Sequence, residues 1–372
     1  MKVAVTGAGG FLGWHLRVHL RAEHGIDAIA ISRGDFSSAE ALARRLAGVD
    51  VVYHLAGVNR AETEGEMESG NASIAVSLAE ALCRLDRPVH VVYGNSIQAE
   101  LDNAYGRGKR EAAGILGGAV KEAGGTLANV LLPNIFGEHG RPKYNSFVAT
   151  FCDVIARGGT PTVTGDRPVP LLHAQDVAAA LVEAGSAHET CVHQPDGESH
   201  SVKEVLAMLE GFHELYTRGE VPEMTTSFQT NLFNTYRSYV FPAAYPMKAS
   251  VNADQRGELF ETVRSHGRAG QTFVSTTAPG VTRGDHFHIR KFERFFVLQG
   301  SAEIALRRVY DDKVVRFRVD GQDRAFVDMP TMWVHNINNV GDDELMTLFW
   351  TDQLFDPEKP DTYWEPVEVG AS

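Results

Sequence analysis

The chain begins with Met1-Lys2-Val3-Ala4-Val5-Thr6-Gly7-Ala8-Gly9-Gly10-Phe11-Leu12-Gly13, a short apolar strand that leads directly into a glycine-rich turn. Glycines in this pattern allow a tight turn, a close approach of backbone N–H groups to a pyrophosphate, and close packing of the next helix on the strand. The alternative is an ordinary strand-to-helix turn, which the flanking strand and helix disfavour. We therefore predict a dinucleotide site that includes Gly7, Gly10, Phe11, Leu12 and Gly13.

Apolar strand-like runs alternate with helical patterns through the first two thirds of the chain. We expect strands over residues 2–5, 28–32, 51–56, 89–93 and 127–132, and helices over residues 10–24, 38–46, 73–85 and 105–123. This alternation is typical of βαβ units, so the fold class is α/β, with a Rossmann-type doubly wound parallel sheet.

The pattern changes from about Asn252 to short strands separated by Gly, Pro and Asp. We expect strands over residues 271–276, 294–299, 302–308, 314–319 and 345–350. Their spacing predicts an all-β barrel or sandwich with antiparallel strands. The Pro- and aromatic-rich stretch at residues 239–246 separates the alternating strand-helix pattern from the β-rich pattern. We therefore predict one domain over residues 1–245 and another over residues 246–372.

Composition supports two folded domains and excludes several classes of partner. A chain of 372 residues with 43% hydrophobic and 22% charged positions is too long for one core and too apolar for disorder. The net charge of -13 argues against nucleic acid and anionic membranes as partners. No apolar run approaches the roughly 18 to 20 residues of a membrane span, and a strand stands where a secretory signal would begin. Three cysteines without a CxxC pair fit a reducing compartment, so we expect a cytoplasmic protein.

The end of the second expected strand bears on the choice of cofactor. Ser32-Arg33-Gly34 stands where an NAD enzyme usually carries an acidic residue for the ribose 2′-OH. A guanidinium at this point suits a 2′-phosphate, which favours NADPH and makes Ser32 and Arg33 cofactor contacts. Asp35 is close enough in sequence to keep NADH possible, and a solvated surface arginine is the alternative reading of Arg33.

Tyr105 and Lys109 form a YxxxK pattern at the start of an expected helix, nine residues after Ser96. A spacing of four residues places the two side chains on one helix face. Reduction of a ketone requires a proton at the oxygen, and a phenol beside an ammonium is a better acid and base at neutral pH. We predict Ser96, Tyr105 and Lys109 to be catalytic, against the alternative of a surface helix.

These features resemble the extended short-chain dehydrogenase/reductases that act on nucleotide sugars. Further matches are His54-Leu55-Ala56-Gly57, Pro133-Asn134-Ile135-Phe136-Gly137 and His173-Ala174-Gln175-Asp176-Val177. The resemblance implies that Leu55, Ala56, Tyr105 and Lys109 contact the cofactor, and that Asn134 and His173 contact the substrate. The short interval from Ser96 to Tyr105 suggests that a loop over the substrate is missing.

Arg141-Pro142-Lys143-Tyr144-Asn145 follows the second of these matches. It offers two cations and an amide, and we assign Arg141, Lys143 and Asn145 to the substrate diphosphate. A solvated loop is the alternative.

The β-rich part carries a candidate metal site. His286 and His288 project from the same side of a strand, because side chains alternate along it. Glu293 and His335 would complete a cluster of three imidazoles and one carboxylate, which suits Zn, Fe, Mn or Ni. We predict a divalent metal, with Zn favoured.

The spacing of these residues is identified as that of the two cupin sequence motifs. Met332 and Arg324 replace two glycines of the second motif, so its turn geometry is open. Some sugar-epimerase cupins use a histidine base without a metal, which is the alternative. Lys291 is a candidate proton carrier or a surface charge. Residues 254–261 resemble the entry segment of deoxysugar epimerase cupins, which implies that Arg256 contacts substrate phosphate, with an ordinary turn as the alternative.

The order of the two domains resembles the bifunctional capsular-polysaccharide enzymes of the UDP-N-acetyl-L-fucosamine pathway, over nearly the whole chain. The most specific matches are HLAGVNR at residues 54–60, PKYNSFVATFC at 142–152, NTYRSY at 234–239 and GDHFHIRKFE at 284–293. The resemblance implies a UDP-2-acetamido-2,6-dideoxy-4-hexulose substrate. The cupin would epimerise C3, and the reductase would then reduce C4 with NADPH to a UDP-N-acetyl-6-deoxy-L-talosamine product.

Two other functions stay open at this point. One is a monofunctional NADPH reductase whose cupin serves dimerisation, and the other is an NADP-sensing regulator without catalysis. Tyr105 and Lys109 argue against the regulator, because a sensor needs no proton donor. A homodimer is expected from the family and from the need to cover barrel edge strands.

Overall fold

The computed structural model describes residues 1–255, 257–267 and 270–369. The chain divides into two compact units, the first formed by Met1–Thr150 and Gly165–Val202, and the second by Phe151–Thr164 and Lys203–Ser372. The sequence boundary predicted between residues 245 and 246 falls inside the second unit and stays a prediction.

The first unit is built on a six-stranded sheet in which every strand pair is parallel and the order is β2-β1-β3-β4-β5-β8. Its strands are β1 (Val3–Thr6), β2 (Ile29–Ile31), β3 (Val51–His54), β4 (His90–Ser96), β5 (Thr126–Leu132) and β8 (Cys191–His193). The first strand lies inside the sheet with later strands on both sides, which confirms the predicted doubly wound fold.

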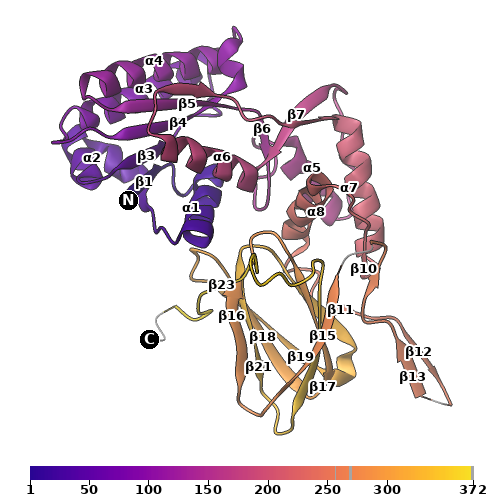
Figure 1. The fold of residues 1–372 in the computed structure, drawn as a ribbon. Coiled ribbons are helices and arrows are strands. Elements are labelled where there is room, and N and C mark those ends of the chain that lie inside the picture. The colour runs from indigo at the N-terminus through magenta and orange to yellow at the C-terminus, as the bar shows by residue number, and fades with distance from the viewer. Residues whose placement is uncertain (256, 268–269, 370–372) are drawn as a thin grey trace. The chain divides into compact units, whose positions relative to one another are not determined.

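Helices cover both faces of this sheet (Figure 1). They are α1 (Phe11–His24), α2 (Ala39–Leu46), α3 (Glu64–Leu82), α4 (Ala104–Glu122) and α6 (Ala174–Ala187), with the short 3-10 helices η1 (Arg33–Ser37) and η2 (Ile97–Glu100). Leu16 of α1 and Leu181 of α6 belong to the core on one face, whereas Leu42 of α2, Leu78 of α3 and Leu116 of α4 belong to the core on the other.

Helix α3 begins nine residues before the predicted start at residue 73. The Thr63 hydroxyl accepts a hydrogen bond from the Glu66 N–H, and the Glu66 carboxylate accepts one from the Thr63 N–H. This capping box starts the helix within a polar stretch that carries little apolar periodicity.

A smaller sheet of order β6-β7-β9 follows β5 along the chain. Its strands are β6 (Asn134–Phe136), β7 (Pro168–His173) and β9 (Glu198–Ser201). Three further helices are α5 (Phe147–Ala156), α7 (Val202–Tyr216) and α8 (Ser227–Val240), and α7 and α8 lie in the second unit.

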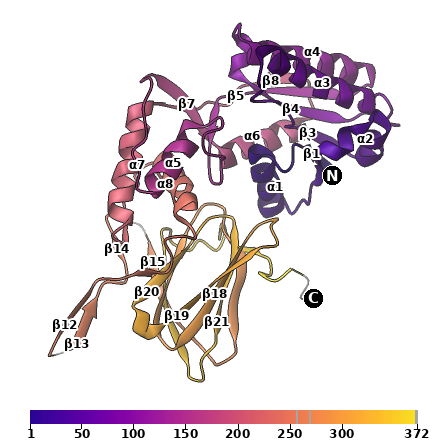
Figure 2. The same cartoon turned by 180° about the vertical axis from the view of Figure 1, so that it is seen from behind.

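The second unit contains two five-stranded sheets, ordered β11-β20-β17-β22-β15 and β19-β18-β21-β16-β23, in which all strand pairs are antiparallel (Figure 2). The strands are β11 (Met247–Lys248), β15 (Gln271–Thr277), β16 (Thr282–Phe287), β17 (Glu293–Gln299), β18 (Ser301–Arg308), β19 (Val314–Asp320), β20 (Ala325–Met329), β21 (Trp333–Asn339), β22 (Leu345–Thr351) and β23 (Tyr363–Trp364), with the 3-10 helix η3 (Gly321–Asp323) before β20. The antiparallel β-rich C-terminal part predicted from the sequence is confirmed.

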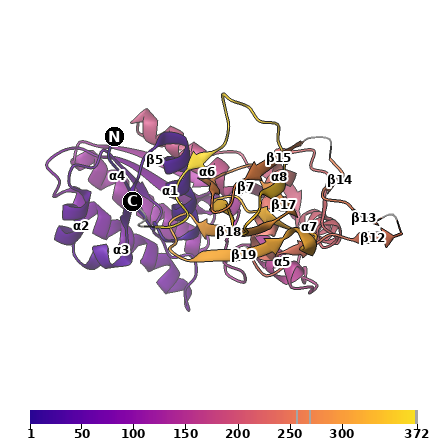
Figure 3. The same cartoon turned by 90° about the horizontal axis from the view of Figure 1, so that it is seen from below.

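The remaining strands lie outside these two sheets. β10 (Glu220–Val221) pairs in parallel with β14 (Arg264–Ser265). β12 (Val251–Asp254) and β13 (Gly257–Phe260) form a hairpin that projects from the second unit (Figure 3). None of the helices in the described residues is long and apolar enough to cross a membrane.

Met332 and Arg324, which replace two motif glycines, both adopt the left-handed conformation that glycine favours, with φ of 61° and 49°. Both turns therefore have the backbone conformation that glycine would allow, although each side chain there costs about 1 kcal/mol in strain. Met332 is fully buried, and its N–H donates to the His288 carbonyl oxygen at 2.6 Å. The turn thus anchors a residue of the candidate metal cluster.

Candidate functional site

The glycine-rich turn packs directly against the segment after β3. A Cβ on Gly7, whose φ is 67°, would lie 2.8 Å from the Ala56 nitrogen, and a Cβ on Gly13 would lie 2.2 Å from the Gly7 oxygen. The Thr6 hydroxyl also accepts hydrogen bonds from the N–H groups of Leu55 and Ala56. The two segments predicted to contact the dinucleotide are therefore side by side.

The N-terminus of α1 is available to an anion. Its N-cap is Gly10, no side chain caps it, and its first turn contains no acidic residue. Free N–H groups at a helix start bind phosphate, so this end of α1 fits a pyrophosphate.

Asp35 is engaged within the chain. Its carboxylate accepts hydrogen bonds from the N–H and the hydroxyl of Ser32, both at 2.7 Å, and lies 3.2 Å from Arg45. These bonds, led by the Ser32 hydroxyl, lower the pKa of Asp35. Arg33 is exposed beside it. The local charge available to a cofactor at this point is therefore positive.

Tyr105 and Lys109 lie together on α4, as their spacing predicts. The Lys109 Nζ is 6.0 Å from the Tyr105 ring centroid and donates to the Gly94 carbonyl oxygen at 2.9 Å. Burial lowers the pKa of Lys109 to about 8 and raises that of Tyr105 to about 12. Lys109 is therefore an ammonium at neutral pH that can stabilise a phenolate on its neighbour.

Ser96 ends β4 and begins η2, where its hydroxyl accepts from the Gln98 N–H at 3.2 Å. It is half-buried. The hydroxyl proton remains free for donation to another group, as a catalytic contact to a carbonyl oxygen would need.

Sequence reasoning missed Asn59 as a neighbour of the phenol. The Tyr105 hydroxyl donates to the Asn59 Oδ1 at 3.2 Å, and the Asn145 amide donates to the Asn59 carbonyl oxygen at 3.5 Å. The Arg60 guanidinium binds the Lys143 carbonyl oxygen at 2.8 Å. These contacts hold the 141–145 loop beside Tyr105.

The side chains assigned to the substrate diphosphate are exposed. Arg141, Lys143 and Asn145 all reach solvent, and the Arg141 guanidinium lies 5.2 Å from the Tyr144 ring centroid. Asn134 is exposed at the start of β6, where its amide donates to the Pro170 carbonyl oxygen at 3.4 Å. All four side chains are accessible from solvent.

His173 lies in a buried polar group instead. Its Nε2 is 3.0 Å from a Glu138 carboxylate oxygen, and both side chains are at most 4% exposed. Burial would raise the pKa of Glu138, but the neighbouring His173 and His15 outweigh it and hold that pKa at about 2. Contact of His173 with a substrate would require this pair to open, so that assignment stays a prediction.

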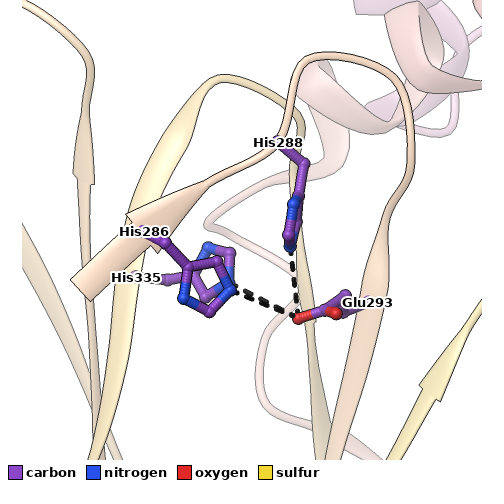
Figure 4. Close-up of side chains that lie close together, drawn as sticks. All are labelled: His286, His288, Glu293 and His335. Carbon is purple, nitrogen blue, oxygen red and sulfur yellow. Dashed lines mark ion pairs between the residues drawn. The ribbon is translucent and has the colours of Figure 1, made fainter. Parts of the chain in front are cut away.

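His286, His288, Glu293 and His335 converge in the second unit, as predicted (Figure 4). His286 on β16 pairs with His335 on β21, and Glu293 begins β17. One Glu293 oxygen lies 3.4, 3.6 and 3.9 Å from the Nε2 atoms of His288, His335 and His286. Candidate ligand atoms of all four residues lie within 4.8 Å of one another.

The cluster has the chemistry of a metal site. The Nε2 atoms of His288 and His335 are buried without a hydrogen-bond partner, an arrangement that costs free energy unless something binds there. Burial lowers the pKa of His335 to about 4, so the ring is neutral and able to act as a ligand. Burial opposes ionisation of Glu293, but the three histidines around it hold its pKa well below the usual range. Three imidazoles and a carboxylate fit Zn and similar divalent ions.

Lys291 follows His288 in the same loop and is 8% exposed. Its ammonium donates to the Pro360 carbonyl oxygen at 2.9 Å and to the Thr362 hydroxyl at 3.3 Å. A role as proton carrier would draw on its third N–H and stays a prediction. Arg256, predicted to bind phosphate, lies outside the described residues.

The fold and these sites define a nicotinamide-dependent enzyme with an appended antiparallel β domain. Residues 3–196 match the NAD dependent epimerase/dehydratase family, and the chain belongs to that family. Residues 252–363 match the polysaccharide biosynthesis C-terminal domain.

Relatives match over different shares of the chain. The UDP-2-acetamido-2,6-beta-L-arabino-hexul-4-ose reductase of Pseudomonas aeruginosa is 33% identical over 375 residues, which cover 100% of both chains. The probable low-salt glycan biosynthesis epimerase Agl13 of Haloferax volcanii is 27% identical over 125 residues, 30% of this chain and 78% of that one. The crystal structure of the capsular polysaccharide assembling protein CapF of Staphylococcus aureus matches with a TM-score of 0.63 and 30% identity, over 99% of this chain and 100% of that one.

Proposed function

We propose that this chain is a two-step nucleotide-sugar enzyme. Its β domain epimerises C3 of a UDP-2-acetamido-2,6-dideoxy-4-hexulose, and its first unit then reduces the C4 ketone with NADPH to a UDP-N-acetyl-6-deoxy-L-talosamine product. The observation that carries the proposal is the full-length similarity to a UDP-sugar 4-hexulose reductase in a chain that holds both the Tyr105–Lys109 pair and the His/Glu cluster.

The chemistry of the ketone fixes the order of the steps. The hydrogen on C3 is acidic only while C4 is a carbonyl, because its removal then gives an enolate. Once C4 is an alcohol, that stabilisation is gone. Epimerisation therefore precedes reduction, and reduction traps the epimer.

In the reduction, Tyr105 gives its phenolic proton to the C4 oxygen, and Lys109 stabilises the phenolate that remains. Ser96 donates a hydrogen bond to the same oxygen. The glycine turn would hold NADPH, which would supply the hydride when bound. Asn59, which accepts from the Tyr105 hydroxyl, keeps the phenol protonated and oriented before the ketone enters.

NADPH is preferred because the acidic group that would bind a ribose 2′-OH is already committed. The Asp35 carboxylate is already engaged by Ser32 and Arg45. Arg33 is exposed and able to meet a 2′-phosphate with charge-assisted hydrogen bonds.

In the epimerisation, a proton leaves C3 on one face of the ring and returns on the other. A divalent metal, when bound, supplies Lewis acidity for the developing enolate. His286, His288, Glu293 and His335 are the residues that would hold it. Lys291 is the candidate for moving the proton.

Two further parts of the proposal concern the setting of the enzyme. Phe273 and Val274 are exposed on β15, at an edge of its sheet, with 41% and 55% of their surface accessible. An apolar edge strand favours pairing with a second copy, which supports a homodimer.

We place the enzyme in the cytoplasm, where NADPH and UDP-sugars are made.

The proposal is tested with two single-site variants. Tyr105→Phe should stop reduction while C3 exchange continues, whereas His286→Ala should stop C3 exchange while a ketone epimerised beforehand is still reduced. Loss of both activities in both variants would contradict separate sites. Unchanged reduction in Tyr105→Phe would contradict the role of the phenol, and absence of reduction in the wild type would favour a sensor.

A further inference from the structure

The last strand of the β domain brings a segment near the C-terminus alongside the candidate metal cluster. We call residues 360–367 the C-terminal strap. Within it, β23 pairs with β16, where Trp364 faces His286 and Tyr363 faces Phe287. A buried ion pair between Arg307 and Glu365, with N···O of 2.6 Å, holds the far end of the strap.

Asp361 in the strap binds the loop that joins two of the cluster residues. Its carboxylate accepts hydrogen bonds from the backbone N–H groups of Ile289, Arg290 and Lys291 at 2.9–3.0 Å. The next N–H, that of Phe292, donates to the Asp352 carboxylate at 3.0 Å. Every backbone N–H between His288 and Glu293 therefore donates a hydrogen bond to a carboxylate.

Asp361 also contacts a cluster residue directly. Its carbonyl oxygen accepts from the His288 Nδ1 at 2.5 Å, so the proton lies on Nδ1 and the Nε2 lone pair faces Glu293. The backbone of Asp361 is left-handed, with φ of 45°, a conformation that Asp tolerates better than most residues. Asp361 thus fixes both the conformation of the 289–291 loop and the tautomer of His288.

We propose that Asp361 is a positioning residue that holds His288 and Glu293 in the geometry that binds a metal. The inference rests on the metal site of the proposed function. The Met332 N–H fixes His288 from the other side, through its carbonyl oxygen. Without the Asp361 carboxylate, three adjacent N–H groups lose their acceptor, and the loop between the two ligands gains freedom that metal binding must then remove.

The loop should stay folded when the carboxylate is removed, because its apolar side chains are anchored independently. Ile289 and Phe292 are at most 1% exposed in the core of the β domain. The substitution therefore loosens two ligands without removing the element that carries them.

The test uses Asp361→Gly, which keeps the left-handed backbone and the carbonyl bond to His288 but removes the carboxylate. Asp361→Asn retains one acceptor oxygen and should fall between this variant and the wild type. The matched control is Asp356→Gly, since Asp356 is an exposed aspartate five residues earlier in the chain. Within the described residues, its carboxylate accepts a hydrogen bond from the Glu358 N–H and does not contact the cluster.

Zinc affinity is measured on the metal-free full chain by competition with a chromophoric chelator, and amide exchange of residues 289–292 by mass spectrometry. We expect Asp361→Gly to weaken zinc binding by about 10–100-fold, as losing an outer partner of a metal ligand typically does, and to speed exchange in the metal-free loop. An affinity within threefold of wild type, with unchanged exchange, would overturn the inference.

The outcome is separable from that of the proposed function. If wild type binds zinc but never exchanges the C3 proton, the epimerase proposal fails while the affinity difference still supports Asp361. If C3 exchange occurs and Asp361→Gly binds zinc as wild type does, only the inference about Asp361 fails.

Discussion

Replacing Lys109 with methionine tests whether the ammonium stabilises a phenolate on Tyr105, an interaction whose energy follows from the distance between the two groups. Methionine has a similar length and no charge, so it fills the space without the ammonium. The Lys109 Nζ lies 6.0 Å from the Tyr105 ring centroid. At an effective dielectric constant of about 20, two unit charges at this separation interact by about 3 kcal/mol.

That energy is the stabilisation a phenolate on Tyr105 would lose. Since 1.4 kcal/mol corresponds to a factor of ten, Lys109→Met should slow reduction by roughly 100-fold. The wild-type profile should also depend on pH. The Lys109 pKa is about 8, so the ammonium is lost and reduction slows as the pH rises through that value. The variant should lose this decline.

The assay follows NADPH oxidation with the pre-epimerised ketone from pH 6 to pH 10. Lys121→Met is the matched control, because Lys121 is exposed in the last turn of the same helix. C3 exchange should be unchanged in Lys109→Met, since it needs no hydride. A loss below fivefold, or a wild-type profile that is flat across pH 8, would refute the role given to the ammonium.

Three other substitutions probe the remaining sites. Arg33→Ala should raise the KM for NADPH by about 10–100-fold, because one charge-assisted contact is lost, and should leave the KM for NADH unchanged. Arg84→Ala is the control. An equal effect on both cofactors would contradict a contact between Arg33 and the 2′-phosphate. Glu293→Gln should weaken zinc binding, measured by chelator competition, by more than the roughly 10–100-fold typical of an outer partner, and wild-type affinity would exclude the carboxylate as a ligand. Glu138→Gln should lower the free energy of unfolding by about 2 kcal/mol near pH 7. The Glu138 pKa is about 2 when folded and about 4.5 when unfolded, so this difference should shrink as the pH falls from about 4.5 toward 2 in urea unfolding; a constant difference would contradict the charged pair.

Local sequence signals predicted the parts of the sites that are formed by neighbours in the chain. The glycine turn at residues 7–13 joins one strand to the next helix, and Tyr105 and Lys109 are one helical turn apart. The His/Glu cluster was also predictable, because the spacing of a strand pair is enough to place His286, His288 and Glu293 near each other.

Contacts between distant segments could not be predicted in this way. Asn59 meets Tyr105 across 46 positions, and Asp361 meets the 289–291 loop across about 70. Neither residue belongs to a periodic pattern, and both act through hydrogen bonds that depend on how the strands are ordered. His173 shows the converse, since a motif position expected at the substrate lies in a buried pair with Glu138.

The backbone conformation of two turns also could not be predicted from residue type. Met332 and Arg324 stand where the cupin motif has glycine, yet both residues adopt the positive φ that the glycines would provide. The residue type there does not dictate the turn, because strand pairing on either side compensates for the strain.

The central claim is that one chain epimerises before it reduces. It is tested most directly by incubating the wild-type protein with the UDP-4-keto sugar in D2O without NADPH and following C3 by NMR. We predict that deuterium enters C3 and that no C4 alcohol forms. No deuterium at C3, in protein that reduces the pre-epimerised ketone once NADPH is added, would contradict the account and leave a reductase alone.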